Sequence, residues 1–238
     1  MGNIQINEKF LLSSVIQVHQ QEDVSQRQWI HDSKPPHLYA NSLGEVWIDI
    51  QQGILDYGQL LDDYIEMRNV DFHVPQVTLP DIIIDRWADQ SNIIEMRKVF
   101  LTEETNRFGH SYHSRMAGPF AGDPIEAVVA VLTAKQSSRQ AVINISNDGN
   151  GNVPCVNIIH FMIRNRVLSV SYYARGQDIF NKFYADALCV FDIAKQVAEH
   201  LNIEPISIHG NIGSAHVYLA DVPKAQSMII SAFKDCMR

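Results

Sequence analysis

Apolar residues recur at helical spacing in four parts of the chain, and each recurrence predicts an amphipathic helix. Ser42 and Asp123 stand directly before two of these parts and are favourable N-cap residues, while Pro124 suits the first helical position. The four expected helices cover residues 42–61, 125–134, 179–201 and 223–234.

Shorter apolar or alternating runs predict strands between these helices. Pro75 lies inside the first run, and because proline cannot donate to a sheet ladder, that strand is expected at an edge. Asn165 and Arg166 join two runs into a hairpin. Strands with helices interposed irregularly predict an α+β domain, a large mixed β-sheet flanked by helices. The expected strands cover residues 70–79, 140–145, 155–164, 167–174, 206–212 and 216–219.

Polar segments separate these elements. Residues 1–37 form a polar N-terminal arm of unassigned role, and residues 102–106 are expected to belong to a long functional loop. The run 146–152, Ser-Asn-Asp-Gly-Asn-Gly-Asn, predicts a turn directly before the strand that begins at Cys155.

Length and composition favour a single folded domain over residues 1–238. The chain has 238 residues, 46% of them hydrophobic, which suffices for a full core. It contains no run of about 18 uncharged apolar residues. Its opening, Met-Gly-Asn-Ile-Gln-Ile, matches neither a secretory signal nor a myristoylation signal. We therefore expect a soluble, cytoplasmic protein with no membrane partner.

Charge and cysteine usage narrow the partners further. A formal net charge of -8 argues against a nucleic-acid polymer, because phosphate backbones are bound by basic faces. A small anionic ligand is compatible with this charge, since a few arginines bind one phosphate. Cys155, Cys189 and Cys236 lack the spacing of metal ligands, so we expect no metal site and a reducing compartment.

Cys155 is the residue with the clearest chemical potential. It follows Pro154 and a turn and starts a strand, which places its thiol at the end of an element. A free cysteine is usually a small buried apolar residue, and a single arginine is usually a solvated ion-pair partner. The occurrence of Arg139 and Arg175 together with Cys155 favours a ligand site over both ordinary explanations.

The C-terminal half resembles the thymidylate synthase family, and in particular its compact archaeal-type members and the cytidylate hydroxymethylases. The family's order is a Pro-Cys strand start, a Leu-Ser strand, an Arg-Ser-x-Asp turn, a helix that bears an asparagine, and a His-x-Tyr strand. The chain has Pro154-Cys155, Leu168-Ser169, Arg175-Gly176-Gln177-Asp178, Asp186 and His216-Val217-Tyr218 at closely similar spacing.

The resemblance implies a role for each of these residues. Cys155 would add to carbon 6 of a pyrimidine nucleoside monophosphate, which makes carbon 5 nucleophilic. A cation such as Arg175 or Arg139 would favour the thiolate and bind the phosphate. In the family Asp178 binds the pterin of 5,10-methylenetetrahydrofolate. The remaining implied roles are a proton transfer at carbon 5 for Tyr112, sugar binding for His216 and Tyr218, and a homodimer in which Arg139 serves the neighbouring site.

Asp186 departs from the family in an informative way. The synthases have an asparagine here, whose amide both donates to and accepts from uracil. A carboxyl group instead suits the 4-amino group and N3 of cytosine, and the deoxycytidylate hydroxymethylases carry aspartate at this point. The expected substrate is therefore CMP or dCMP.

Other departures also favour hydroxymethylation. Val156, His160, Gln140, Gly176 and Ser214 replace the family's histidine, glutamine, second arginine, serine and aspartate. The glutamate that organises water lacks its motif, with Glu66 and Glu95 as candidates, and the polar end 234–238 lacks the apolar tail that closes over the folate. A less closed site favours addition of water to the carbon 5 methylene over transfer of hydride. The alternatives are a divergent synthase that methylates dUMP and a non-catalytic nucleotide-binding member of the fold.

Overall fold

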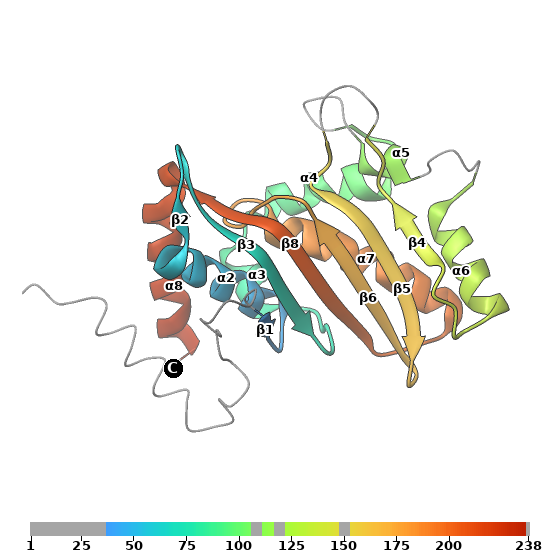
Figure 1. Ribbon diagram of the computed structural model, residues 1–238. Coiled ribbons are helices and arrows are strands. Elements are labelled where there is room, and N and C mark those ends of the chain that lie inside the picture. Colours follow the sequence, from blue (N-terminus) through green and yellow to red (C-terminus); the bar gives the residue numbers. More distant parts are fainter. Residues whose placement is uncertain (1–36, 106–110, 117–121, 148–152, 237–238) are drawn as a thin grey trace, which may run out of the picture.

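The computed structural model describes residues 37–105, 111–116, 122–147 and 153–236 (Figure 1). Most of the predicted turn at 146–152, and all of the predicted arm except His37, therefore lie outside the described residues. The strands are β1 (His37–Tyr39), β2 (Gln59–Leu60), β3 (Tyr64–Val74), β4 (Ala141–Asn144), β5 (Val156–Arg164), β6 (Val167–Ala174), β7 (Gln177–Asp178) and β8 (Ile206–Tyr218). The helices are α2 (Leu43–Tyr57), α3 (Ile82–Trp87), α4 (Gln90–Leu101), α5 (Tyr112–Met116), α6 (Pro124–Ala134), α7 (Phe183–Leu201), the 3-10 turn η3 (Leu219–Asp221) and α8 (Val222–Cys236).

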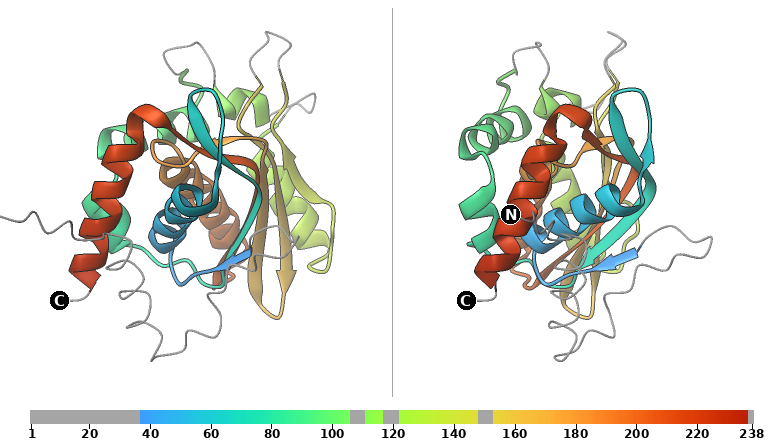
Figure 2. Two further views of the ribbon diagram at one scale, coloured as in Figure 1. Left: turned by 60° about the vertical axis from the view of Figure 1, so that its left-hand side comes forward. Right: turned by 90° about the vertical axis from the view of Figure 1, so that its left-hand side faces the viewer.

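The strands form one mixed eight-stranded sheet in the order β1-β3-β8-β6-β5-β4, with β2 paired to β3 and β7 to β8. β6 and β8 are parallel, and α7 makes the crossover between them. The described helices pack on one face of the sheet (Figure 2). The fold class predicted from the sequence is therefore confirmed.

The four predicted helices are present, with shifted ends. Ser42 accepts from the backbone N–H of Glu45 at 3.2 Å, and Asp123 accepts from that of Ile125 at 2.7 Å, as N-caps do. α2 ends at Tyr57 rather than at residue 61, because the chain turns into β2. α7 begins at Phe183.

Two strand predictions were wrong. β3 is not at an edge, because it lies between β1 and β8, and Pro75 follows its last residue, so the ladder loses no donor there. Residues 206–212 and 216–219 do not form two strands, because β8 runs through Gly213 without a break.

The hairpin of β5 and β6 is confirmed, with Asn165 and Arg166 at its turn in the left-handed region at φ 50° and 64°. Arginine is strained there, so Arg166→Gly is expected to raise the free energy of unfolding by about 0.5–1 kcal/mol. Urea denaturation measures the change. The matched Arg164→Gly, inside β5, should lower stability by about the same amount; a loss in both variants would contradict the turn assignment.

Irregularities in neighbouring strands line up at one end of the sheet. Asn69 has a φ of 54°, and β3 and β8 keep their register across it. The β5–β6 register shifts between Val156 and Ile158. A Cβ at Gly213 would stand 2.8 Å from the carbonyl oxygen of Arg175, so this close approach requires glycine. Cys155 and Arg175, two of the residues predicted for chemistry, lie at this line, directly beyond the ends of β5 and β6.

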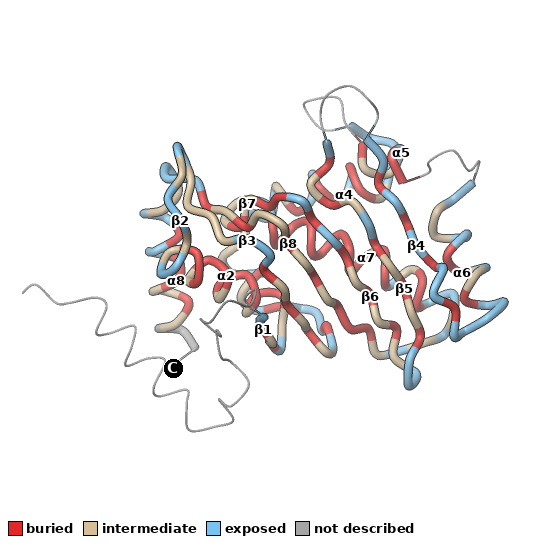
Figure 3. Tube along the Cα trace, viewed as in Figure 1, coloured by how far each residue is buried: buried red, intermediate tan, exposed pale blue. Residues whose placement is uncertain are grey.

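α7 is the central helix of the core, and nearly all of its first three turns is buried (Figure 3). The indole Nε1 of Trp47 donates to the carbonyl of Ile179 at 2.7 Å, which ties α2 to the loop before α7. This loop connects β7 to α7 and so fixes the start of the helix that carries Asp186. Within the described ranges, no helix combines the length and the apolar character that crossing a bilayer requires.

Candidate active site

Cys155 lies where β5 begins and β6 ends. Its backbone carbonyl accepts from the N–H of Arg175 at 2.9 Å, one residue beyond the ends of both strands. The thiol-bearing residue is half-buried. The expected position of Cys155 at the end of a strand is therefore confirmed.

The side chain of Arg175 holds the segment before the cysteine. Its Nε donates to the carbonyl of Pro154 at 3.1 Å, and its Nη2 donates to the carbonyl of Val153 at 2.6 Å. Since a guanidinium carries five N–H donors, this pairing leaves donors for a phosphate oxygen. The structure thus brings Arg175 to Cys155, as the sequence predicted.

Tyr112 approaches Cys155 from the start of α5. Its hydroxyl oxygen accepts from the backbone N–H of Cys155 at 3.0 Å, and its ring stacks on Phe100 with centroids 4.0 Å apart. Burial raises the pKa of the phenol well above its ordinary value, so the hydroxyl keeps its proton at neutral pH. A protonated phenol at this place can donate to the sulfur or move a proton near it.

Tyr112→Phe removes the acceptor of the Cys155 N–H. We expect the free energy of unfolding to fall by about 1–2 kcal/mol, because a partly buried donor loses its partner, and turnover to fall by about 10²-fold. Chemical denaturation and single-turnover rates measure the two effects. Tyr57→Phe, at an exposed position at the end of α2, is the matched control; equal effects in both variants would remove Tyr112 from the chemistry.

Asp186 is a buried carboxyl group in the first turn of α7, with 2% of its surface exposed. Its Oδ2 accepts from the amide Nε2 of Gln177 at 2.7 Å. Burial raises its pKa to about 7, although the charge of Lys182 and the bond from Gln177 oppose this rise. Near neutral pH the carboxyl is therefore divided between its acid and its ionised form.

Burial also raises the pKa of the Cys155 thiol, and the charge of Asp186 raises it further. Arg175 and the Tyr112 hydroxyl lower it without cancelling these effects. Arg175 thus acts in the predicted direction, but the thiol of the ligand-free protein stays protonated at neutral pH. A ligand that removes the negative charge of Asp186 would favour the thiolate.

Asn181 links two carboxylates beside this centre. Its backbone N–H and its Nδ2 each donate to Asp178 at 3.0 Å, and the same Nδ2 donates to Asp221 at 2.9 Å. Asp178 pairs with His216 through the β7–β8 ladder. The charge of Asp178 affects the pKa of Cys155, which puts the carboxylate pair within electrostatic reach of the thiol.

His216 and Tyr218 lie on the same side of β8, with ring centroids 5.4 Å apart. Tyr64 packs against both rings. Ser214 donates to Oε1 of Glu66 at 2.5 Å and lies 3.5 Å from Nδ1 of His216. A carboxylate from β3 thus lies beside position 214, where the resemblance leads one to expect an aspartate. The sequence offered Glu66 for another role, that of the glutamate that organises water, and this role stays a prediction.

Arg139 is not part of this group within one chain. It is exposed and precedes β4, whose first residue, Ala141, pairs with Phe161. Phe161 lies six positions after Cys155, a distance of about 20 Å along a strand. A role for Arg139 at a neighbouring subunit's site stays a prediction.

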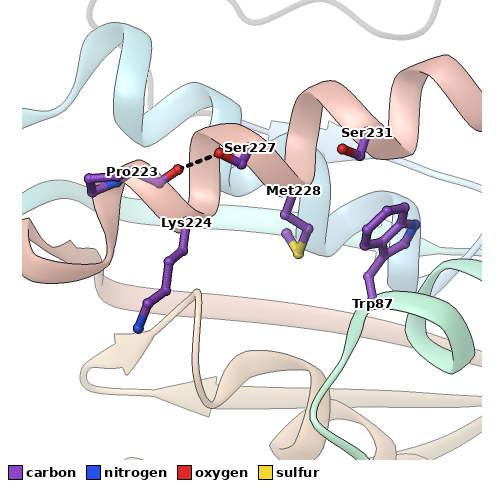
Figure 4. A pocket seen from close by; sticks show the side chains of 6 residues that line it. All are labelled: Trp87, Pro223, Lys224, Ser227, Met228 and Ser231. Carbon is purple, nitrogen blue, oxygen red and sulfur yellow. Dashed lines mark hydrogen bonds between the residues drawn. The ribbon is translucent and has the colours of Figure 1, made fainter.

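A separate hollow of about 440 Å³ lies between Trp87 and α8, and Lys224 and Met228 line it with Trp87 (Figure 4). None of the residues discussed above lines this hollow. The other candidate glutamate, Glu95, is exposed on α4, in a second hollow that it shares with Lys98. Among the described residues, no group of three His, Cys, Asp or Glu side chains is placed to hold a metal ion.

The sequence profile described as "Thymidylate synthase" matches residues 82–235, which is more than half of the chain. The chain belongs to the thymidylate synthase family. The motif around Cys155, Asp178 and Tyr218 lies inside the matched range, so the resemblance drawn from these residues is confirmed.

Two relatives illustrate the range of the family. A protein of Methanocaldococcus jannaschii named "Putative thymidylate synthase" is 22% identical over 215 residues, which cover 83% of this chain and 96% of that protein. The "Deoxyuridylate hydroxymethyltransferase" of Bacillus phage SP01 is 32% identical over 108 residues, which cover 42% of this chain and 28% of that protein. Together with the profile, these relatives support a pyrimidine C5 one-carbon transferase.

Thymidylate synthase A from Bacillus subtilis has the same fold. Its structure aligns with a TM-score of 0.62 at 12% identity and covers 79% of this chain and 84% of its own. The alignment confirms the thymidylate synthase fold of the chain.

The family generally uses methylenetetrahydrofolate, and the carboxylates of this site suit that cofactor. A pterin ring presents N–H donors, which require acceptors. Asp178 and Asp221 are half-buried, and Asn181 holds both in place. An aspartate pair that is partly desolvated and fixed by an amide therefore fits a pterin edge.

The sequence did not single out Gln177, Asn181 or the bond from Ser214 to Glu66. Gln177 could have been noticed, because it occupies the variable position of the Arg-Ser-x-Asp motif, next to Asp178. The Glu66 bond could not, since it depends on the register that sets Glu66 of β3 beside His216 of β8. Two other departures from the family stand on β5: Val156 is fully buried, and the Nε2 of His160 is buried without a partner among the described residues.

Proposed function

We propose that this chain hydroxymethylates carbon 5 of a cytosine nucleotide, CMP or dCMP, through a covalent bond between Cys155 and carbon 6. The observation that carries the proposal is Asp186, a buried carboxyl with a pKa of about 7, close enough to affect the pKa of Cys155. The synthases of the family have an amide at the corresponding point of the motif. The phage hydroxymethyltransferase supports the reaction type, although its name specifies a deoxyuridylate.

A carboxyl group near its pKa suits the edge of cytosine. In its acid form Asp186 donates to N3 through one oxygen and accepts from the 4-amino group through the other. The bound base thereby keeps the carboxyl neutral. This removes the negative charge that raises the pKa of Cys155, so binding of the base also promotes formation of the thiolate.

The sulfur of Cys155 then attacks carbon 6. The new bond forms as the electrons of the C5–C6 double bond move toward carbon 5, which becomes nucleophilic. Tyr112 holds the backbone of the nucleophile and is placed to move the proton that leaves carbon 5. Arg175 fixes the Pro-Cys segment and offers its remaining donors to the phosphate.

Methylenetetrahydrofolate would supply the one-carbon unit. Asp178 and Asp221 would accept hydrogen bonds from its pterin, and His216 and Tyr218 would bind the sugar of the nucleotide. The roles of Asp178, His216 and Tyr218 rest on the family resemblance, and that of Asp221 on its bond to Asn181, which also holds Asp178. The charges of Cys155 and Asp178 affect the pKa of Tyr218 and of Cys155, respectively.

A homodimer would form through the open face of the sheet. None of the described helices covers this face (Figure 2). Val142, Ile158 and Tyr173 stand next to buried neighbours on their strands and are 38–42% exposed. Exposed apolar side chains on an uncovered sheet favour an interface between copies. Such an interface would bring Arg139 of one copy toward the other.

The test is the mass of the product formed with methylenetetrahydrofolate and CMP, dCMP, UMP or dUMP in separate reactions. The proposal predicts a gain of CH2O on a cytosine nucleotide. A gain of CH2 on dUMP would identify a divergent thymidylate synthase. No product from any nucleotide, with binding retained, would identify a non-catalytic member of the family.

A further inference from the structure

Gln177 and Asp186 form an isolated polar pair inside the core. Their side chains are 1% and 2% exposed, and the Nε2–Oδ2 hydrogen bond is 2.7 Å long. Within the described part of the chain, Oδ1 of Asp186 and Oε1 of Gln177 are buried and have no hydrogen-bond partner. Buried polar atoms normally have hydrogen-bond partners. Two atoms without a partner in one pair therefore indicate that a ligand or a water molecule forms hydrogen bonds with them.

The bond from Gln177 determines which oxygen of a neutral Asp186 carries the proton. An amide N–H donates well to the carbonyl oxygen of a carboxylic acid and poorly to its hydroxyl oxygen. Because Nε2 of Gln177 occupies Oδ2, that oxygen acts as the carbonyl. The acid proton therefore stands on Oδ1, the atom without a partner.

We infer that Gln177 is a specificity-determining residue that acts through Asp186 by keeping Oδ1 as the donor and Oδ2 as the acceptor. This inference rests on the proposed function, because it takes Asp186 as the residue that contacts the base. Gln177 itself is a positioning residue.

The resulting pattern favours one base. Cytosine presents an acceptor at N3 and a donor at its 4-amino group, which pair with Oδ1–H and Oδ2. Uracil presents a donor at N3 and an acceptor at O4. In the same pose its N3–H would face the donor Oδ1–H, and its O4 would face the acceptor Oδ2. Binding of uracil requires the acid proton to move to Oδ2, where the N–H of Gln177 opposes it.

The test is the ratio of dissociation constants for dCMP against dUMP, and for CMP against UMP, in the wild type and in Gln177→Met. Methionine keeps the length of the side chain and removes the amide donor. The preference of the wild type for cytosine should fall by about tenfold, since one orienting hydrogen bond is lost. Calorimetry measures these constants without depending on turnover.

Gln51→Met is a matched control. Gln51 is also fully buried, also donates once through Nε2, to the carbonyl of Trp47 at 3.0 Å, and also has an unpartnered Oε1, but it has no bond to Asp186. Its substitution should lower stability and leave the ratio unchanged. If both variants weaken the binding of cytosine and uracil nucleotides equally, Gln177 is only structural and the inference fails. If the wild type binds neither base, the proposed function itself fails.

Discussion

Cys155→Ala is expected to abolish product formation, by on the order of 10⁴-fold or more, while the nucleotide still binds. Carbon 5 of a pyrimidine is a poor nucleophile until a group has added at carbon 6. Among the described residues, Cys155 is the one thiol at the end of the sheet where Tyr112, Arg175 and Asp186 meet. Rapid-quench turnover and calorimetric binding measure the two parts of this expectation.

Cys189→Ala provides the control. Cys189 is fully buried in α7, and burial raises the pKa of its thiol well above the ordinary value, so it is unreactive. Its loss should cost some stability and leave turnover within a few-fold of the wild type. If Cys155→Ser kept the biological role of the protein, the covalent mechanism would be ruled out. A non-catalytic, nucleotide-binding role would then be supported.

Asp186→Asn is expected to shift the substrate preference from cytosine toward uracil by about 10²-fold. The hydrogen-bond pattern of an amide at position 186 is set by its orientation. When its nitrogen faces O4 of uracil and the Oε1 of Gln177, which has no partner among the described residues of the wild type, its oxygen accepts from N3–H of uracil. The penalty that the acid form of Asp186 imposes on uracil is then removed. The measurement is kcat/KM for dCMP and dUMP in both proteins; an unchanged ratio would show that Asp186 does not contact the base.

The same variant tests the buried carboxyl without any ligand. The pKa of Asp186 is about 7 in the folded protein, against 3.8 ordinarily, so the folded state binds its proton more tightly. The stability contributed by the neutral carboxyl is fully present below about pH 4 and is lost as the pH rises to about 7. The rise of the pKa from 3.8 to about 7 corresponds to about 4 kcal/mol in the free energy of unfolding. Urea unfolding from pH 4 to 8 should therefore show Asp186→Asn gaining stability relative to the wild type by an amount of this order. Parallel pH profiles would contradict the assignment.

Local patterns predicted the parts of the fold that depend on neighbouring residues. The caps at Ser42 and Asp123 and the turn at Asn165 and Arg166 act over four residues or fewer, so composition alone identified them. Pairing between distant strands was harder. Pro75 suggested an edge strand because the predicted strand included it. The sequence does not show that β3 ends at the residue before Pro75. Two strands were predicted where β8 is continuous, and the sequence does not show that Gly213 lets β8 approach the carbonyl of Arg175 closely.

The candidate site likewise contains residues that local motifs identify and contacts that depend on the pairing of distant strands. Cys155, Tyr112, Arg175, Asp178 and Asp186 belong to motifs, and the structure gathers them at one end of the sheet. Ser214 replaces an aspartate of the family, and its hydroxyl donates to Glu66 on another strand. Such a contact depends on strand register, which one sequence does not encode locally. Arg139 lies apart from these residues, and its role at the site of a neighbouring subunit stays a prediction.

Release of tritium from carbon 5 of the base tests the central claim most directly. Addition of Cys155 at carbon 6 and attachment of a one-carbon unit at carbon 5 must displace the hydrogen there. With methylenetetrahydrofolate, the account predicts tritium release from tritiated dCMP or CMP and none in the Cys155→Ala variant. Release from dUMP alone, or equal release with and without Cys155, would contradict it.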